Sequence, residues 1–254
     1  MTQVLNWVTE HYPRLQSLKL DIEQCHIDCL GSLRQLKSLC WTGYSATSPT
    51  RTADVLAKLT NLEELTVIGP PPGLQLLQRH DCQKNIVQSV THQLFERIKP
   101  LKRLTLAQIT DSKTDSSVFF TSKTMKALYE IHNQSLKALT ISSSTVPDSA
   151  FVEYLSAFLL GTVNIQELSL TWPEMQTSVV DCVPNTIRRL EIAVGSGKEA
   201  QSIIERLEMM VYRLRDLQHI TFQIINPVHK APFNIREEKS PLLAFGMPIQ
   251  NLSG

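Results

Sequence analysis

The segment Gly195-Ser196-Gly197-Lys198 has the residue types of a phosphate-binding loop, in which glycine N–H groups and a lysine hold a nucleotide's phosphates. That motif also needs a glycine where this chain has Ile192, and a serine or threonine where it has Glu199. Part of the backbone cradle and the magnesium-binding hydroxyl are therefore missing. We expect a turn in which Ser196 caps the following helix instead.

Cysteine and histidine side chains gather at Cys25, His26 and Cys29, with Cys40 further along the chain. Zinc sites usually combine cysteine pairs two to four residues apart with a second matched pair, and these spacings do not match that pattern. Cys25 and Cys29 are four residues apart, as on one face of a helix, and Cys40 falls on an expected strand. We expect these cysteines to be small buried apolar residues.

His80-Asp81-Cys82 contains a base, an acid and a nucleophile in consecutive positions. Adjacent residues on one segment cannot readily converge on a substrate as a catalytic triad does. The chain is therefore predicted not to be an enzyme, with no cofactor and no metal site.

The composition is that of a soluble globular protein. The 254 residues are 42% hydrophobic, and 25 Lys and Arg against 24 Asp and Glu give a formal net charge of +1. This balance provides no basic surface for a nucleic acid. The first dozen residues lack a secretory signal, the longest apolar stretch (residues 151–163) is too short to span a membrane, and the five cysteines are irregularly spaced. We predict a cytoplasmic or nuclear protein that binds neither nucleic acid nor membranes.

One short phrase recurs eight times: an apolar residue, two variable residues, a second apolar residue, one variable residue and a third apolar residue. The last two apolar residues have the spacing of a strand with one buried face. The phrases are Leu15/Leu18/Leu20, Leu36/Leu39/Trp41, Leu62/Leu65/Val67, Leu101/Leu104/Leu106, Leu136/Leu139/Ile141, Ile165/Leu168/Leu170, Ile187/Leu190/Ile192 and Leu217/Ile220/Phe222.

Between the phrases the apolar spacing changes to that of helices. The clearest stripe runs from Ala200 to Leu214, after Ser196, and another runs from Phe151 to Leu159, after Asp148. A third helix is predicted over residues 86–98, and weaker ones follow Ser48-Pro49 and Thr121-Ser122. Strands that alternate with helices predict parallel strands joined by right-handed crossovers.

The phrases resemble the leucine-rich repeat family, in its irregular ribonuclease-inhibitor-like branch, and are similar to the repeats of F-box leucine-rich repeat proteins. Successive phrases begin about 29 residues apart on average, which is at the upper edge of the family's range. The resemblance implies an α/β solenoid with a curved parallel sheet on the concave side and helices on the convex side. Only residues 1–14 precede the first phrase, so the F-box itself, a helical segment of roughly 40 residues, is expected to be absent from this chain.

The variable positions within the phrases predict which side chains face a partner, because they point away from the buried face. One column is Lys19, Cys40, Thr66, Thr105, Thr140, Ser169, Glu191 and Thr221, and its neighbour is Ser17, Ser38, Glu64, Arg103, Ala138, Glu167, Arg189 and His219. One interpretation is that the threonines of these columns simply suit exposed strand positions, without any binding role. The alternative hypothesis is that Glu64, Arg103, Glu167, Arg189 and Glu191 form the polar part of a protein-binding surface.

Two long insertions are further binding candidates. One begins at Gly69-Pro70-Pro71-Pro72-Gly73, and the other covers residues 107–121 and contains Phe119 and Phe120. If exposed, these phenylalanines would be anchors for a protein partner, since aromatic side chains dominate binding hot spots. The alternative is that one of them packs beneath the loop.

The domain organisation predicted from these patterns has three parts. Residues 1–14 form an N-terminal capping helix, residues 15–225 form a leucine-rich repeat domain of about eight irregular repeats, and residues 226–254 form an irregular C-terminal cap or tail. As a cap, the last part would cover the edge of the final repeat with Leu242, Leu243 and Phe245; as a tail, it would be a linker.

The function expected from these features is non-catalytic protein–protein recognition. The similarity to F-box repeat proteins implies substrate recognition for a ubiquitin ligase, with ligase components among the partners. The alternative is a structural subunit held permanently in a large intracellular assembly.

Overall fold

The computed structural model describes residues 2–20, 26–41, 44–45, 47–69, 87–88, 90–108 and 120–225. Within these residues, eight parallel strands form one sheet, in which each strand lies beside the next one of the set along the chain. The strands are β1 (Ser17–Leu20), β2 (Ser38–Trp41), β4 (Glu64–Ile68), β6 (Arg103–Gln108), β7 (Ala138–Ser143), β8 (Glu167–Thr171), β9 (Arg189–Val194) and β10 (His219–Ile224). Two short antiparallel strands, β3 (Tyr44–Ser45) and β5 (Val87–Gln88), pair separately.

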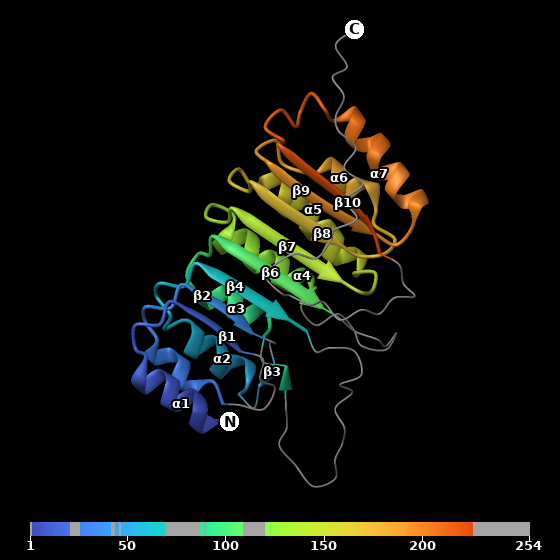
Figure 1. Ribbon diagram of the computed structural model, residues 1–254. Helices are drawn as coiled ribbons and strands as arrows, with labels where there is room; N and C mark the ends of the chain where they lie inside the picture. The colour runs from blue at the N-terminus through green and yellow to red at the C-terminus, as the bar shows by residue number, and fades with distance from the viewer. Residues whose placement is uncertain are drawn as a thin grey trace, which may run out of the picture.

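Helical segments connect the strands and cover one face of the sheet (Figure 1). They are α1 (Thr2–His11), the 3₁₀ turn η1 (Asp28–Ser32), α2 (Pro49–Leu56), α3 (His92–Arg97), α4 (Ser122–Ala127), the π-helical turn η2 (Leu128–His132), α5 (Ser149–Gly161), α6 (Thr177–Asp181) and α7 (Gly197–Met209). No helix in the described ranges is long and apolar enough to cross a membrane. The predicted alternation of strands and helices in an α/β fold is confirmed.

The register of the sheet follows the recurring phrase. The second apolar residues of the phrases are paired from strand to strand, and those of β2 to β9 are buried: Leu39, Leu65, Leu104, Leu139, Leu168 and Leu190. A slip of one residue would turn every one of these side chains to the opposite face, so the period of two fixes the register. The phrase therefore predicted both the strands and their alignment.

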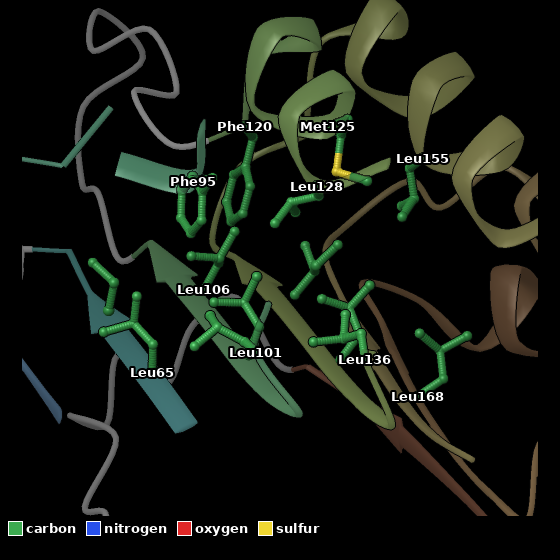
Figure 2. Close-up of a cluster of buried hydrophobic side chains, with 14 of the residues drawn as sticks. Leu65, Phe95, Leu101, Leu106, Phe120, Met125, Leu128, Leu136, Leu155 and Leu168 are labelled. Carbon is green, nitrogen blue, oxygen red and sulfur yellow. The ribbon is translucent and has the colours of Figure 1, made fainter. Parts of the chain in front are cut away.

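The core lies between the sheet and the helices. Phe95 on α3, Met125 and Leu128 on the α4–η2 segment, and Leu155 on α5 pack towards the strand leucines, as Figure 2 shows. Each buried leucine or phenylalanine contributes about 1.5–3 kcal/mol of transfer free energy. Since strands β2 to β9 each bury their apolar side chains against their neighbours, the stability of this part of the chain is distributed along the sheet.

Several predicted helix starts are confirmed by capping contacts. Ser48 accepts a hydrogen bond from the Arg51 N–H at the start of α2 (3.4 Å), and Asp148 accepts one from the Ala150 N–H at the start of α5 (2.8 Å). These bonds satisfy N–H groups that the first turn of a helix leaves without partners.

The helix predicted over residues 86–98 is shorter than expected. Val87 and Gln88 pair as β5 with β3, and Thr91 has an extended backbone, so α3 begins only at His92. The backbone of β5 pairs with β3, which begins 43 residues earlier in the chain, instead of forming the helical hydrogen bonds that the local apolar spacing predicted. This part of the prediction was wrong because tertiary pairing overrode the local periodicity.

Candidate functional site

The candidate site is the face of the sheet opposite the helices, which we call the open face. The two predicted columns lie side by side there, because each of their residues pairs in register with its equivalent on the next strand. Four of the five predicted charged residues, Arg103, Glu167, Arg189 and Glu191, line one shallow hollow of about 100 Å³. The fifth, Glu64, lies directly beside Arg103 in the register.

An ion-pair network crosses the open face from β4 to β8. Arg103 donates to Glu167 through two guanidinium nitrogens (2.6 and 3.4 Å), and its Nε lies 3.9 Å from Glu64 Oε1. Arg103 and Glu167 are two strands apart, with Ala138 of β7 between them. The side chain of alanine is short enough for the guanidinium to reach across, and Ala138 is buried in consequence.

Of the five predicted charged residues, Arg189 and Glu191 are the two that remain without a partner among the described residues. Arg189 pairs in register with Glu167, and Glu191 lies two residues further along β9 on the same face. Both side chains are exposed, and within the described part of the chain neither makes a hydrogen bond or an ion pair. They are therefore available to an external group of opposite charge, whereas Glu167 is already held by Arg103.

The floor of the hollow consists of small hydroxyl side chains. Thr105, Thr140 and Ser169 follow one another on β6, β7 and β8, and all three are partly buried. Hydroxyl groups can both donate and accept hydrogen bonds, so they suit the backbone or polar side chains of a protein ligand. The hollow is too small for most drug-sized ligands, whose pockets measure about 300–1,000 Å³.

The two predicted aromatic anchors have different outcomes. Phe119 lies outside the described residues, as do most of the two insertions that begin at Gly69 and Ala107. Phe120 is buried, at 1% exposure, and its ring centroid lies 5.2 Å from that of Phe151. The prediction that Phe120 is an exposed anchor is therefore wrong. The alternative, that one of the two phenylalanines packs in the core, is confirmed.

The burial of Phe120 follows from its place before a helix. Thr121 is the N-cap of α4 and accepts a hydrogen bond from the Thr124 N–H (3.2 Å). Phe120 and Met125, both buried, then occupy the two positions of a hydrophobic staple, which fixes the entry of the chain into the helix. An apolar residue directly before Thr121-Ser122, after which a helix was expected, was the sequence signal for this role.

The phosphate-loop candidate is a helix cap, as predicted. Ser196 accepts a hydrogen bond from the Glu199 N–H (3.3 Å), and Glu199 Oε2 accepts from the N–H groups of Gly195 (3.2 Å) and Glu174 (2.9 Å). The carboxylate of Glu199 thus takes up one N–H group of the loop, that of Gly195, and places a negative charge where a phosphate would lie. The arrangement is a variant of the capping box, in which the glutamate accepts from the residue before the N-cap and from a neighbouring loop.

The remaining candidates for chemistry are the cysteine cluster and residues 80–82, and the structure describes only some of these residues. Cys25 and residues 80–82 lie outside the described residues. Burial raises the pKa of the Cys29 thiol above its ordinary value, so it is a poor nucleophile near neutral pH. Across the ranges that the structure describes, no group of three or more His, Cys, Asp or Glu side chains could hold a metal ion.

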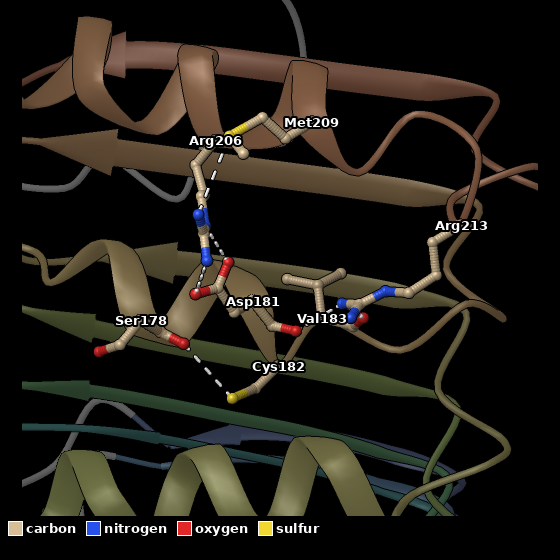
Figure 3. A network of polar contacts seen from close by, with 7 residues as sticks. All are labelled: Ser178, Asp181, Cys182, Val183, Arg206, Met209 and Arg213. Atoms are coloured by element: carbon tan, nitrogen blue, oxygen red, sulfur yellow. Dashed lines mark hydrogen bonds and ion pairs between the residues drawn. The ribbon is translucent and has the colours of Figure 1, made fainter.

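A second polar cluster lies on the helix side, between α6 and α7 (Figure 3). Arg206 Nη2 donates to Asp181 Oδ2 (2.7 Å), and Arg213 donates to the backbone carbonyls of Asp181 (2.5 Å) and Val183 (2.8 Å). The hydrogen bond from Arg206 lowers the pKa of Asp181. Both guanidinium groups are thus engaged within the chain: Arg206 pairs with the Asp181 carboxylate, and Arg213 satisfies carbonyls at the end of α6. We interpret this cluster as structural.

Comparison with known proteins adds no functional assignment. The chain matches no protein-family model, and no curated protein sequence is significantly similar to it.

Proposed function

We propose that this chain is a non-catalytic protein-recognition module built from leucine-rich repeats, and that it binds its partner on the open face. The observation that carries the proposal is the pair of unsatisfied charges, Arg189 and Glu191, beside the Glu64–Arg103–Glu167 network. An exposed charge that no neighbour satisfies is ready to pair with a partner's charge and to set specificity. In the proposed solenoid the open face is the concave side, which offers a partner the largest continuous surface.

The network gives this surface a fixed charge pattern. Arg103 lies between two carboxylates and Glu167 accepts two hydrogen bonds, so the network favours one arrangement of these exposed side chains. A partner therefore loses less side-chain entropy on binding here than on a surface of independent lysines and glutamates. The partner that fits presents an acidic side chain to Arg189 and a basic one to Glu191.

The resemblance to F-box repeat proteins leads to a narrower form of the proposal, namely substrate recognition for a ubiquitin ligase in the cytoplasm or nucleus. Affinity purification of the intact chain from cells, followed by quantitative mass spectrometry, tests it. Recovery of a cullin-ligase adaptor in proportion to the bait supports the ligase role. Recovery of other partners without any ligase component contradicts that role and leaves the recognition surface to be tested by mutation.

A structural subunit is the second candidate, because apolar side chains are exposed at the end of α7 and directly after it. Met209 is 72% exposed and Tyr212 is 83% exposed. Permanent interfaces are large and apolar. A complex of fixed stoichiometry that survives high salt would favour this candidate over a recognition module, whose charged interface weakens as salt increases.

A further inference from the structure

The last strand of the sheet lacks the cover that strands β2 to β9 have. On β9 the helix-facing residues Leu190, Ile192 and Val194 are buried, at 0–1% exposure. Their register partners on β10 are Ile220, Phe222 and Ile224. Ile220 is 38% exposed and Ile224 is 59% exposed, and Phe222 is only partly buried. An apolar surface thus remains at the C-terminal end of the core. Figure 1 shows β10 as the last strand of the sheet, beside α7.

The backbone of β10 is also unpaired on its outer edge. The N–H groups of His219 and Ile225 donate to the Arg188 and Val194 carbonyls beside β9 (3.0 and 2.7 Å). Because successive N–H groups of a strand point in opposite directions, those of Ile220, Phe222 and Ile224 face away from β9. Among the described residues no strand accepts from them. A free edge of this kind is a template for a further strand.

The sequence beyond residue 225 contains a ninth copy of the recurring phrase. Leu242, Phe245 and Met247 have its spacing, and Leu242 follows Leu217 by 25 residues, within the range of 21 to 39 residues between the other phrases. Alignment with the phrase of β10 sets Phe245 opposite Ile220 and Met247 opposite Phe222. Ile249 then falls opposite Ile224, so the apolar residues of this segment match the uncovered positions one by one.

We propose that residues 244–247 bind the free edge of β10 as a ninth parallel strand, and that Phe245, Met247 and Ile249 complete the apolar end of the core. The equivalent strands β1 and β2 are also four residues long. Pro248 has no N–H to donate, so it ends the pairing where those short strands end. The sixteen residues from 226 to 241 are long enough for the crossover that parallel strands need.

The chain's own segment is the occupant that these observations favour over a separate protein. It matches the register of β10, and its covalent connection gives it a millimolar effective concentration at the edge. The proposal does not depend on what the open face binds, since the uncovered residues lie on the opposite face of the sheet.

Amide hydrogen exchange of the full-length chain, resolved by residue with NMR, tests this proposal. The N–H groups of Ile220 and Phe222 should exchange at least about tenfold more slowly than exposed amides, because they donate to the added strand. Phe245→Asp should remove this protection, since it places a charge in the apolar end of the core. Ala244→Asp is the matched control, because residue 244 falls opposite His219 on the open face and should leave the protection unchanged. Unaltered exchange in β6 to β8 shows that each variant is folded.

Three results would overturn the proposal. The first is fast exchange of the Ile220 and Phe222 amides in the unmodified chain. The second is protection that Phe245→Asp leaves intact, which would mean that another segment covers the edge. The third is protection that increases with protein concentration, which would assign the edge to a second copy of the chain.

Discussion

Replacement of His132 by phenylalanine should destabilise the protein strongly, although this residue is far from the open face. His132 is fully buried, and its Nδ1 accepts a hydrogen bond from the Leu101 N–H (3.0 Å) while its Nε2–H donates to the Phe95 carbonyl (3.0 Å). The imidazole therefore joins η2 to the end of α3 and to the segment before β6. Phenylalanine fills a similar volume but satisfies neither backbone group.

The size of the effect follows from these two contacts. Each buried backbone group left without a partner costs about 1–3 kcal/mol, so His132→Phe should lower the free energy of unfolding by about 2–6 kcal/mol at pH 7.5. Urea denaturation followed by circular dichroism measures this loss. The exposed His26 provides a control, since His26→Phe should change the free energy by less than about 0.5 kcal/mol.

The same contacts predict a pH dependence. Burial lowers the pKa of His132 below its ordinary value of 6.5, so the unfolded chain binds a proton more readily than the folded chain. The contribution of His132 to the free energy of unfolding is therefore fully present above pH 6.5. It is lost as the pH falls towards the folded-state pKa, by at most about 1.4 kcal/mol per pH unit. His132→Phe should lack this part of the pH dependence. If the variant is as stable as the wild type, or keeps the full dependence between pH 7.5 and 5.5, the proposed double contact is wrong.

Four further predictions concern stability and reactivity. Arg103→Gln and Glu167→Gln should each change the free energy of unfolding by less than about 1 kcal/mol in urea titrations, because exposed ion pairs stabilise weakly; a larger loss would mean that the network is structural. Ser196→Ala should cost about 1 kcal/mol in the same assay through the lost cap of α7, and no change would contradict the capping box. Leu139→Ala should cost about 2–5 kcal/mol, as expected for a central core leucine, whereas a loss below 1 kcal/mol would mean that its site is poorly packed. Iodoacetamide labelling at pH 7.5, followed by peptide mass spectrometry, should modify Cys29 more slowly in the folded chain than in urea, because its thiol pKa is raised; equal rates would refute its burial.

The strands and their register could be predicted from the sequence because a period of two, repeated eight times, allows only one alignment of the buried leucines. Helices with an apolar stripe and a capping residue, such as α5 and α7, could be predicted for a similar reason. The predicted stripe to Leu214 was too long, since α7 ends at Met209 and Val211 is 60% exposed. The helix over residues 86–98 could not, since β5 depends on a partner 43 residues away. No local pattern marks such a pairing.

The candidate site was predicted in part. The open-face columns follow from strand periodicity, which places Arg189 and Glu191 on the surface. The pairing of Arg103 with Glu167 was missed, although opposite charges on either side of Ala138 in the register were its signal. His132 could not have been singled out, because its role depends on backbone groups 31 and 37 residues away that only the folded chain brings together.

The affinity of a captured partner for charge-reversed variants tests the role of the open face most directly. The double variant Arg103→Glu/Arg189→Glu reverses two charges of the site. The control is Lys123→Glu/Lys198→Glu, which makes the same change in charge on the exposed surface of α4 and α7. Isothermal titration calorimetry should give a dissociation constant at least about tenfold higher for the first variant, since like charges then face each other across the interface. The helix-side variant should bind like the wild type. Equal affinities for all three proteins would contradict recognition through the open face.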